Sequence, residues 1–329
     1  MSIFAVCIIH TALWYIENDN HAGIDYYDLC RSMLWWCVPV FVMISGALLL
    51  GRPVSLRRLF TKRIPRLIVS LVFWSIVYAV VITQGKGGLL NLLGYIVDGF
   101  GHSWFIYMIL GLYLLIPLLT KITESQKATR YFLALSLAFA FIIPRLIEVY
   151  VAVTGRSAGI VQNKIDNMYM FFPLGYSGYF VLGYYITNMT GSHRKRILII
   201  ALSVLVFISV GFSYVFHTGN NVFKQTFKMG YLTPTVLIES IAVFVFLKNH
   251  CELKSVILKR VFSEISECSF GIYLIHILVM NFLLITLDIT KYIGKSVISM
   301  LFISLSVFSL SLLLTMAIKR IPILKNYII

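Results

Sequence analysis

The chain is poor in charged residues: Asp, Glu, Lys and Arg make up 12% of its 329 residues, against about a quarter in an average soluble domain. By contrast, 59% of the residues are hydrophobic. Apolar runs long enough to cross a bilayer, roughly 17–25 residues each, recur along the whole length with short polar breaks. These properties exclude a soluble globular domain and predict a polytopic membrane protein.

Several motifs of soluble enzymes are also missing. The five cysteines form no CxxC motif and have no metal-ligand spacing with histidine, so we expect neither a metal site nor a redox dithiol. Neither a Walker-type phosphate loop nor a GxGxxG motif is present. The net charge of +15 does not indicate a nucleic-acid partner, because in a multispan protein the distribution of Lys and Arg matters more than their sum.

We therefore predict an all-α bundle of about ten transmembrane helices, forming one domain over residues 1–329. Lys and Arg are concentrated in alternate breaks, and the positive-inside rule then places both termini in the cytoplasm. The chain begins inside a first apolar run that is short for a crossing, so we expect an upstream start or an N-terminal truncation rather than a signal peptide. The predicted spans are 2–16, 33–50, 67–83, 102–120, 131–153, 169–188, 197–216, 230–248, 264–288 and 297–317.

His10 is the most informative residue, because it lies within the first apolar run. An imidazole in a span is costly unless it faces a protein interior or a wet cavity, which makes it a candidate functional residue. It lies about one and a half helical turns from the predicted outer end, where an external hydroxyl and a group delivered from the cytoplasm can meet. Judged without its neighbours, a purely structural histidine is an equally good interpretation.

Arg63 and Arg66 form a second candidate site in the basic stretch LRRLFTKRIPRL, at the inner end of the third span. Their i, i+3 spacing places both guanidiniums on one helix face. Guanidiniums stay charged and bind oxyanions through paired hydrogen bonds, so the pair suits phosphate groups. Ordinary anchoring to anionic lipid headgroups is the alternative, and the stretch by itself favours that alternative.

Weaker signals lie in three other spans. In VPVFVMISG at 38–46, Pro39 predicts a bend and Ser45–Gly46 allows close backbone approach; a simple packing kink is the alternative. The fourth span begins with polar aromatic residues, which usually anchor a helix at the membrane interface. The ninth carries a polar stripe that we expect to face the bundle interior. The resulting substrate-binding or oxyanion candidates are Ser45, His102, Trp104, Tyr107, Ser269, Tyr273 and His276.

Six segments carry a resemblance to a known family; in order, they are IIHT, VPVFVMISG, KRIPRL, HSWFIYMILGLYLLIPLL, GYSGYFVLGYYI and SFGIYLIH. Together they resemble acyltransferase family 3, a family of bacterial integral membrane acyltransferases that modify extracytoplasmic glycans. The resemblance covers nearly the entire chain and is closest to the stand-alone branch, which includes O-acetyltransferases of surface polysaccharides and of enterobacterial common antigen. It implies that His10 is the catalytic histidine and that Arg63 and Arg66 are the RxxR pair. The arginine that the family usually has before this histidine segment has no counterpart after Met1.

The resemblance also implies a reaction. Acetyl-CoA, or another acyl-CoA, is the expected donor on the cytoplasmic side, and a hydroxyl of an extracytoplasmic polysaccharide or lipid-linked glycan is the expected acceptor. We expect a multi-pass enzyme of the bacterial cytoplasmic (inner) membrane, with the lipid bilayer as a partner and no nucleic acid. His10 acts as a general base, with a transient acyl-histidine as an alternative.

A second interpretation is a glycan or lipid transporter or flippase, in which His10 and buried acids form a proton path. Ten spans suit that class equally well, but no internal repeat is visible in the sequence.

Overall fold

The computed structural model describes residues 1–18, 24–51, 55–83, 89–218, 230–251, 254–321 and 324, and in these ranges the regular structure is helical, without strands. The larger helices are α1 (Ser2–Asn18), α3 (Cys37–Leu49), α5 (Ile64–Thr83), α7 (Trp104–Thr123), α8 (Gln126–Ser136), α9 (Ile143–Thr154), α11 (Phe171–Thr187), α12 (Gly191–Thr218), α14 (Pro234–His250), α15 (Val256–Asn281) and α17 (Val297–Ile318). Shorter helices are α2 (Ile24–Ser32), α4 (Leu56–Arg58), α6 (Leu89–Asp98), α10 (Gly159–Asp166) and α16 (Thr290–Ile293), and the π-helical segments are η1 (Leu59–Arg63), η2 (Leu137–Ile142) and η3 (Phe282–Thr286).

Six helical stretches of the described chain are long and apolar enough to cross a membrane, so the prediction of an all-α, multi-pass membrane protein is confirmed. The other four predicted spans fall on α1, α11, α12 and α14. The number of ten crossings and the side of the termini stay predictions. Five of the charges used to assign that side, Arg52, Lys86, Lys224, Lys228 and Lys325, lie outside the described residues. The six stretches are Tyr26–Leu49, Leu56–Ile82, Trp104–Thr123, Gln126–Thr154, Val256–Thr286 and Val297–Ile318.

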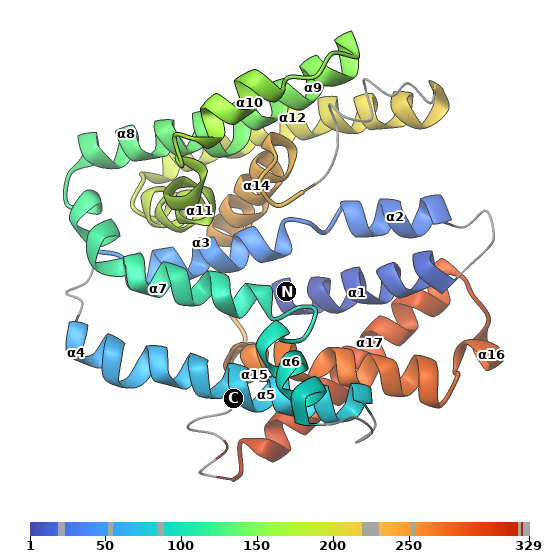
Figure 1. The fold of residues 1–329 in the computed structure, drawn as a ribbon. Helices are drawn as coiled ribbons and strands as arrows, with labels where there is room; N and C mark the ends of the chain where they lie inside the picture. Colours follow the sequence, from blue (N-terminus) through green and yellow to red (C-terminus); the bar gives the residue numbers. More distant parts are fainter. Residues whose placement is uncertain are drawn as a thin grey trace.

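Helices α1, α3 and α7 run through the middle of the bundle (Figure 1). On one side of them lie α8, α9, α11, α12 and α14, and on the other lie α5, α15 and α17. Helix α1 contacts α3, α15 and α17, while α7 contacts α5 and α11. The middle layer therefore touches both outer layers, and any interior site must be built around it.

The second span is interrupted before its proline. Helix α2 ends at Ser32 and α3 begins at Cys37, whose backbone N–H donates to the Leu34 carbonyl at 3.0 Å. Pro39 lies in the first turn of α3, where a missing N–H costs no intrahelical bond. The bend predicted at Pro39 is thus an interruption one turn earlier, because the proline ring disfavours helix in the residues that precede it.

The basic stretch continues directly into the third span instead of preceding it. Pro65 has no N–H to donate within the helix, and the chain before it is the π-helical segment η1, in which the Ile64 N–H donates to the Leu59 carbonyl. A π turn adds a residue to the turn and rotates the helix that continues from it. Arg63 ends this segment and Arg66 lies in the first turn of α5.

Helices α3 and α11 pack backbone against backbone through two glycines. A Cβ on Gly46 would lie 1.8 Å from the Phe180 carbonyl oxygen, and one on Gly183 would lie 2.0 Å from the Met43 carbonyl oxygen. Small residues permit such close approach in membrane bundles. The close approach predicted at Ser45–Gly46 is therefore confirmed at Gly46.

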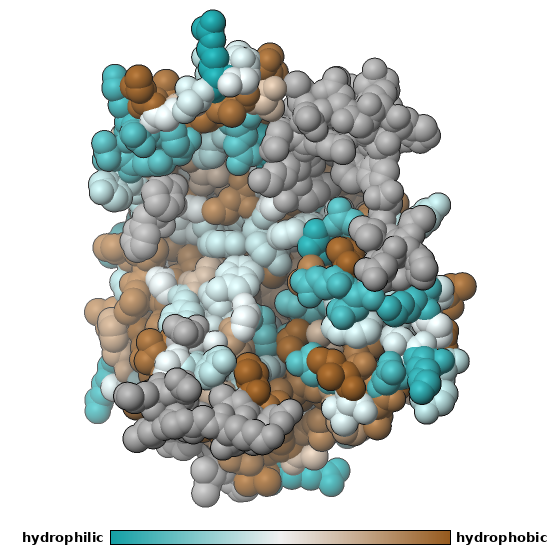
Figure 2. Space-filling view, turned by 45° about the vertical axis from the view of Figure 1, so that its right-hand side comes forward, coloured by the Kyte–Doolittle hydropathy of each residue, from teal (hydrophilic) through white to brown (hydrophobic). Residues whose placement is uncertain are grey.

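The outward faces of the helices are apolar. Helix α5 exposes Val72 and Val80, and α17 exposes Ile298 and Leu313. Figure 2 shows apolar side chains, in brown, reaching the surface between hydrophilic patches. A surface of this kind suits lipid rather than water.

We predict that Gly46→Ala destabilises the protein, because the added methyl group has no space against the α11 backbone. Overpacking of this kind costs about 1–3 kcal/mol, and thermal unfolding of the detergent-purified protein should show a lower midpoint. Gly111→Ala in α7 is the matched control, because its Cβ meets nothing within 4 Å and alanine favours a helix. Equal midpoints for Gly46→Ala and the unaltered protein would contradict the packing argument.

Candidate active site

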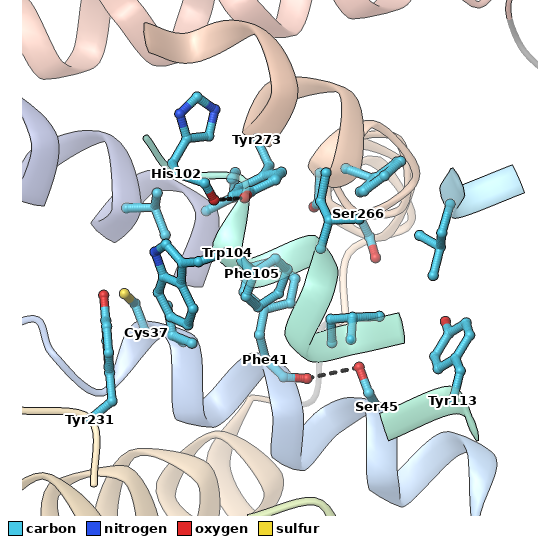
Figure 3. A pocket seen from close by; sticks show the side chains of 18 of the residues that line it. Cys37, Phe41, Ser45, His102, Trp104, Phe105, Tyr113, Tyr231, Ser266 and Tyr273 are labelled. Atoms are coloured by element: carbon cyan, nitrogen blue, oxygen red, sulfur yellow. Dashed lines mark hydrogen bonds between the residues drawn. The ribbon is translucent and has the colours of Figure 1, made fainter. Parts of the chain in front are cut away.

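A cavity of about 550 Å³ lies among α1, α3, α5, α7 and α15. Its lining follows helical spacing, because residues four apart share a helix face. Helix α3 contributes Cys37, Phe41, Ser45 and Leu49. The matching stripes are Phe105, Ile109 and Tyr113 on α7, and Ser266, Phe270 and Tyr273 on α15. Figure 3 shows Tyr231 and Cys37 toward one side of this cavity and Ser45 and Tyr113 toward the other.

Arg63 and Arg66 both line this cavity. Tyr113 lies within electrostatic reach of the two guanidiniums, which places them at the end that also holds Ser45. Arg66 is exposed and Arg63 is half-buried. This arginine end, defined by Arg63 and Arg66, therefore combines two positive charges with access from the surface.

His10 lines the same cavity and belongs to a cluster of three histidines. Its ring centroid lies 6.0 Å from that of His102 and 5.1 Å from that of His276. The His102 and His276 centroids are 4.9 Å apart. The three residues come from α1, from the turn before α7 and from α15. Packing thus gathers three imidazoles that are far apart in the sequence. No group of three or more His, Cys, Asp or Glu residues in the described ranges is able to hold a metal ion.

The hydrogen bonds of His276 define its tautomer. Its Nδ1 lies 2.7 Å from the Tyr273 carbonyl oxygen, and a carbonyl only accepts, so the proton of the neutral ring is on Nδ1. Its Nε2 is then an acceptor. That atom is buried and has no hydrogen-bond partner among the described residues. A neighbouring imidazole N–H is the natural donor to it, because an unsatisfied buried acceptor is costly.

The turn that carries His102 is held by α15 and packed against α5. The Tyr273 hydroxyl donates to the His102 backbone carbonyl (Figure 3), and the Tyr78 hydroxyl donates to the Leu274 carbonyl at 2.9 Å. The His102 ring also packs against Phe100, with centroids 4.5 Å apart. Its position is therefore set by contacts on several sides.

The structure brings most of the predicted site residues to one cavity. His10, Arg63, Arg66, Ser45, His102, Trp104, Ser269 and Tyr273 line it. His276 lies behind the lining, in ring contact with His10 and His102. Tyr107 is the exception: it is 47% exposed and does not line the cavity. Helical spacing explains this, since position 107 lies on the face of α7 opposite to Phe105.

Two aromatic residues at the cavity end away from the arginines were not predicted. Tyr231, just before α14, lines the cavity, and Trp35, between α2 and α3, packs on its ring with centroids 4.5 Å apart. Both are aromatic residues near the end of a predicted span, a pattern typical of interfacial anchors. No feature of the sequence distinguishes them from such anchors.

The helices define a multi-pass membrane protein built around a cavity that holds a histidine cluster and an arginine pair. Residues 1–319 match the family described as an acyltransferase domain. The chain therefore belongs to this acyltransferase family, and the resemblance to acyltransferase family 3 is confirmed. Comparisons with curated proteins and with solved structures gave no match. The family match includes every residue that lines the cavity.

Proposed function

We propose that the protein transfers an acetyl group from cytoplasmic acetyl-CoA to a hydroxyl of an extracytoplasmic polysaccharide or lipid-linked glycan, in a bacterial cytoplasmic membrane. The observation that carries this proposal is that one cavity is lined by His10 and by the pair Arg63 and Arg66. Membership of the acyltransferase family supports the reaction class.

The arginine end is the proposed donor site. The phosphates of acetyl-CoA are multiply charged and favour water, so the exposed position of Arg66 suits them. The pantetheine arm is uncharged and follows the apolar lining formed by Leu67 and Ile109. This arrangement delivers the thioester to the interior while the charges stay at the surface.

His10 is the proposed general base. It takes the proton of the acceptor hydroxyl as that oxygen attacks the thioester carbonyl carbon and forms a tetrahedral intermediate. The C–S bond then breaks, the sulfur leaves with the electron pair, and His10 returns the proton to it. The products are an O-acetyl ester and the free thiol of CoA, so no oxidant or metal is required for the balance.

His276 is the proposed positioning residue for His10. Because His276 Nε2 only accepts, a hydrogen bond from His10 to it fixes the proton on the nitrogen that faces His276. The other nitrogen of His10 is then free of a proton and acts as the base. After proton transfer, the same bond stabilises the positive charge on His10.

Among the proposed oxyanion donors, His102 is the best placed. The hydroxyls of Ser45 and Ser269 donate to carbonyls of their own helices at 2.9 and 2.8 Å, and that of Tyr273 donates to His102. The Nε2 of His102 has no hydrogen-bond partner within the described chain. A proton on this nitrogen can therefore stabilise a developing negative charge.

We predict that His10→Gln abolishes transfer without removing donor binding. Loss of a general base reduces turnover by about 10²–10⁴-fold, which nanodisc assays with radiolabelled acetyl-CoA and membrane glycan would measure as loss of labelled ester and of free CoA. The exposed His193 in α12 supplies the control His193→Gln, which should retain full activity. A transporter would release no CoA in any variant, so absence of CoA release from the unaltered protein would reject the enzyme.

We predict that Arg63→Gln and Arg66→Gln each weaken acetyl-CoA binding by roughly 10- to 100-fold, the loss expected for a charge-assisted hydrogen bond. Arg57→Gln is the matched control, because Arg57 belongs to the same basic stretch but is exposed and does not line the cavity. Binding of S-acetylpantetheine, which lacks the phosphates, should be insensitive to all three changes. Equal losses for both ligands would contradict a phosphate site.

We predict that His276→Phe lowers kcat by roughly 10- to 100-fold, as seen for groups that orient functional histidines, while the KM for acetyl-CoA is unchanged. His276→Gln should restore part of kcat, because its side-chain carbonyl is again an acceptor. If His276 only filled space, the kcat values of His276→Phe and His276→Gln would be reduced to the same extent. Equal kcat values for these two variants would contradict the positioning role.

A further inference from the structure

The end of the cavity away from the arginines is aromatic. Trp104 and Tyr231 line it, with ring centroids 5.3 Å apart and planes inclined by 37°. Trp35 packs behind Tyr231 and Tyr176 packs on Trp104, with centroids 6.0 Å apart. We define these four residues, Trp35, Trp104, Tyr176 and Tyr231, as the aromatic end. They come from four separate segments, so tertiary packing creates this surface.

The rings of the aromatic end have apolar faces and polar edges. Trp104 lines the cavity and is 37% exposed, so its ring is not fully covered by neighbouring side chains. The indole N–H of Trp35 is buried without a hydrogen-bond partner in the part of the chain that the structure describes. Tyrosine and tryptophan usually satisfy such groups when buried. The aromatic end thus presents the apolar faces and polar edges of Trp104 and Tyr231 to the cavity, with Trp35 packed behind them.

Among the described residues, no Lys, Arg, Asp or Glu side chain lines the aromatic end. Arg63 and Arg66 are the only Lys, Arg, Asp or Glu residues that line the cavity in the described chain, and they lie at the other end. Arg31 stacks on Trp35 at 5.9 Å, but it is paired with Asp28 at 2.6 Å. A charged group brought to this end would therefore lose water without meeting an opposite charge among the residues that line it.

We propose that the aromatic end binds the sugar ring that carries the accepting hydroxyl, and that this ring is uncharged. The inference rests on the proposed function, in which the donor occupies the arginine end, so the acceptor reaches His10 from the opposite side. A pyranose presents C–H groups that stack on aromatic faces and hydroxyls that bond to their polar edges. A cavity of about 550 Å³ is the size of a small-molecule site, so one ring enters it rather than a length of polymer.

The first experiment compares acceptors for the nanodisc enzyme with radiolabelled acetyl-CoA. The neutral rings are methyl glycosides of glucose, galactose, mannose, rhamnose and N-acetylglucosamine. Sorbitol and galactitol offer the same hydroxyls without a ring, and methyl glucuronide offers a ring with a charge. We expect transfer to at least one neutral glycoside, and at least about tenfold less to the alditols and the glucuronide. Equal transfer to alditols or glucuronide, or transfer to membrane glycan but to no neutral glycoside, overturns the proposal.

The second experiment changes Tyr231 and measures both substrates. Tyr231→Ala should raise the KM for the glycoside by about tenfold, the effect of losing one stacking ring, with the KM for acetyl-CoA unchanged. Tyr231→Phe keeps the ring and should stay within about threefold of the unaltered protein. The backbone at residue 231 keeps a contact that does not involve this side chain, because the Tyr179 hydroxyl donates to its carbonyl at 2.7 Å.

Tyr292→Ala is the control, since this tyrosine is 81% exposed on α16. Unchanged acceptor KM in Tyr231→Ala, or equal loss in Tyr231→Phe, overturns the aromatic site. Failure of the proposed function has a different signature, because the unaltered protein would then release no CoA with any acceptor.

Discussion

The hydrogen bond from His276 to the Tyr273 carbonyl is the constraint on which the site depends. It fixes which nitrogen of a fully buried imidazole carries a proton, and it leaves an acceptor facing two other histidines. In a bilayer no water is at hand to satisfy such an atom. The rings of His10 and His102 pack against this imidazole and against each other.

The distribution of charge along the cavity is explained by the same lack of water. The two arginines lie where one of them is exposed, and the interior lining is apolar apart from histidine, serine, tyrosine, tryptophan and cysteine. A ligand with a charged head and an uncharged arm fits this gradient in only one direction. The proposed direction of the donor is therefore a consequence of solvation as much as of specific contacts.

Much of this site is visible in the sequence, because its signals are local. A histidine inside an apolar run, two arginines three residues apart and a Ser–Gly pair can be recognised without knowing the fold, and all of them meet at or beside the cavity. The pairing of His10 with His276 depends on packing between α1 and α15, which no spacing reveals. The position of Tyr107 outside the cavity also could not be predicted, because which face of α7 turns inward depends on the neighbouring helices. The short helices α2, α6, α10 and α16 lack the long apolar runs by which spans are found.

The two walls of the cavity differ in how firmly they are built. On the α3 side, Gly46 and Gly183 bring the backbones of α3 and α11 into direct contact. This close contact opposes movement of one helix along the other. On the other side, α5 is joined to α15 through the hydroxyl of Tyr78, a bond that can break and reform. A movement that widens the cavity therefore requires less rearrangement on the α5 side than on the α3 side, because it breaks a side-chain hydrogen bond instead of separating two backbones in contact.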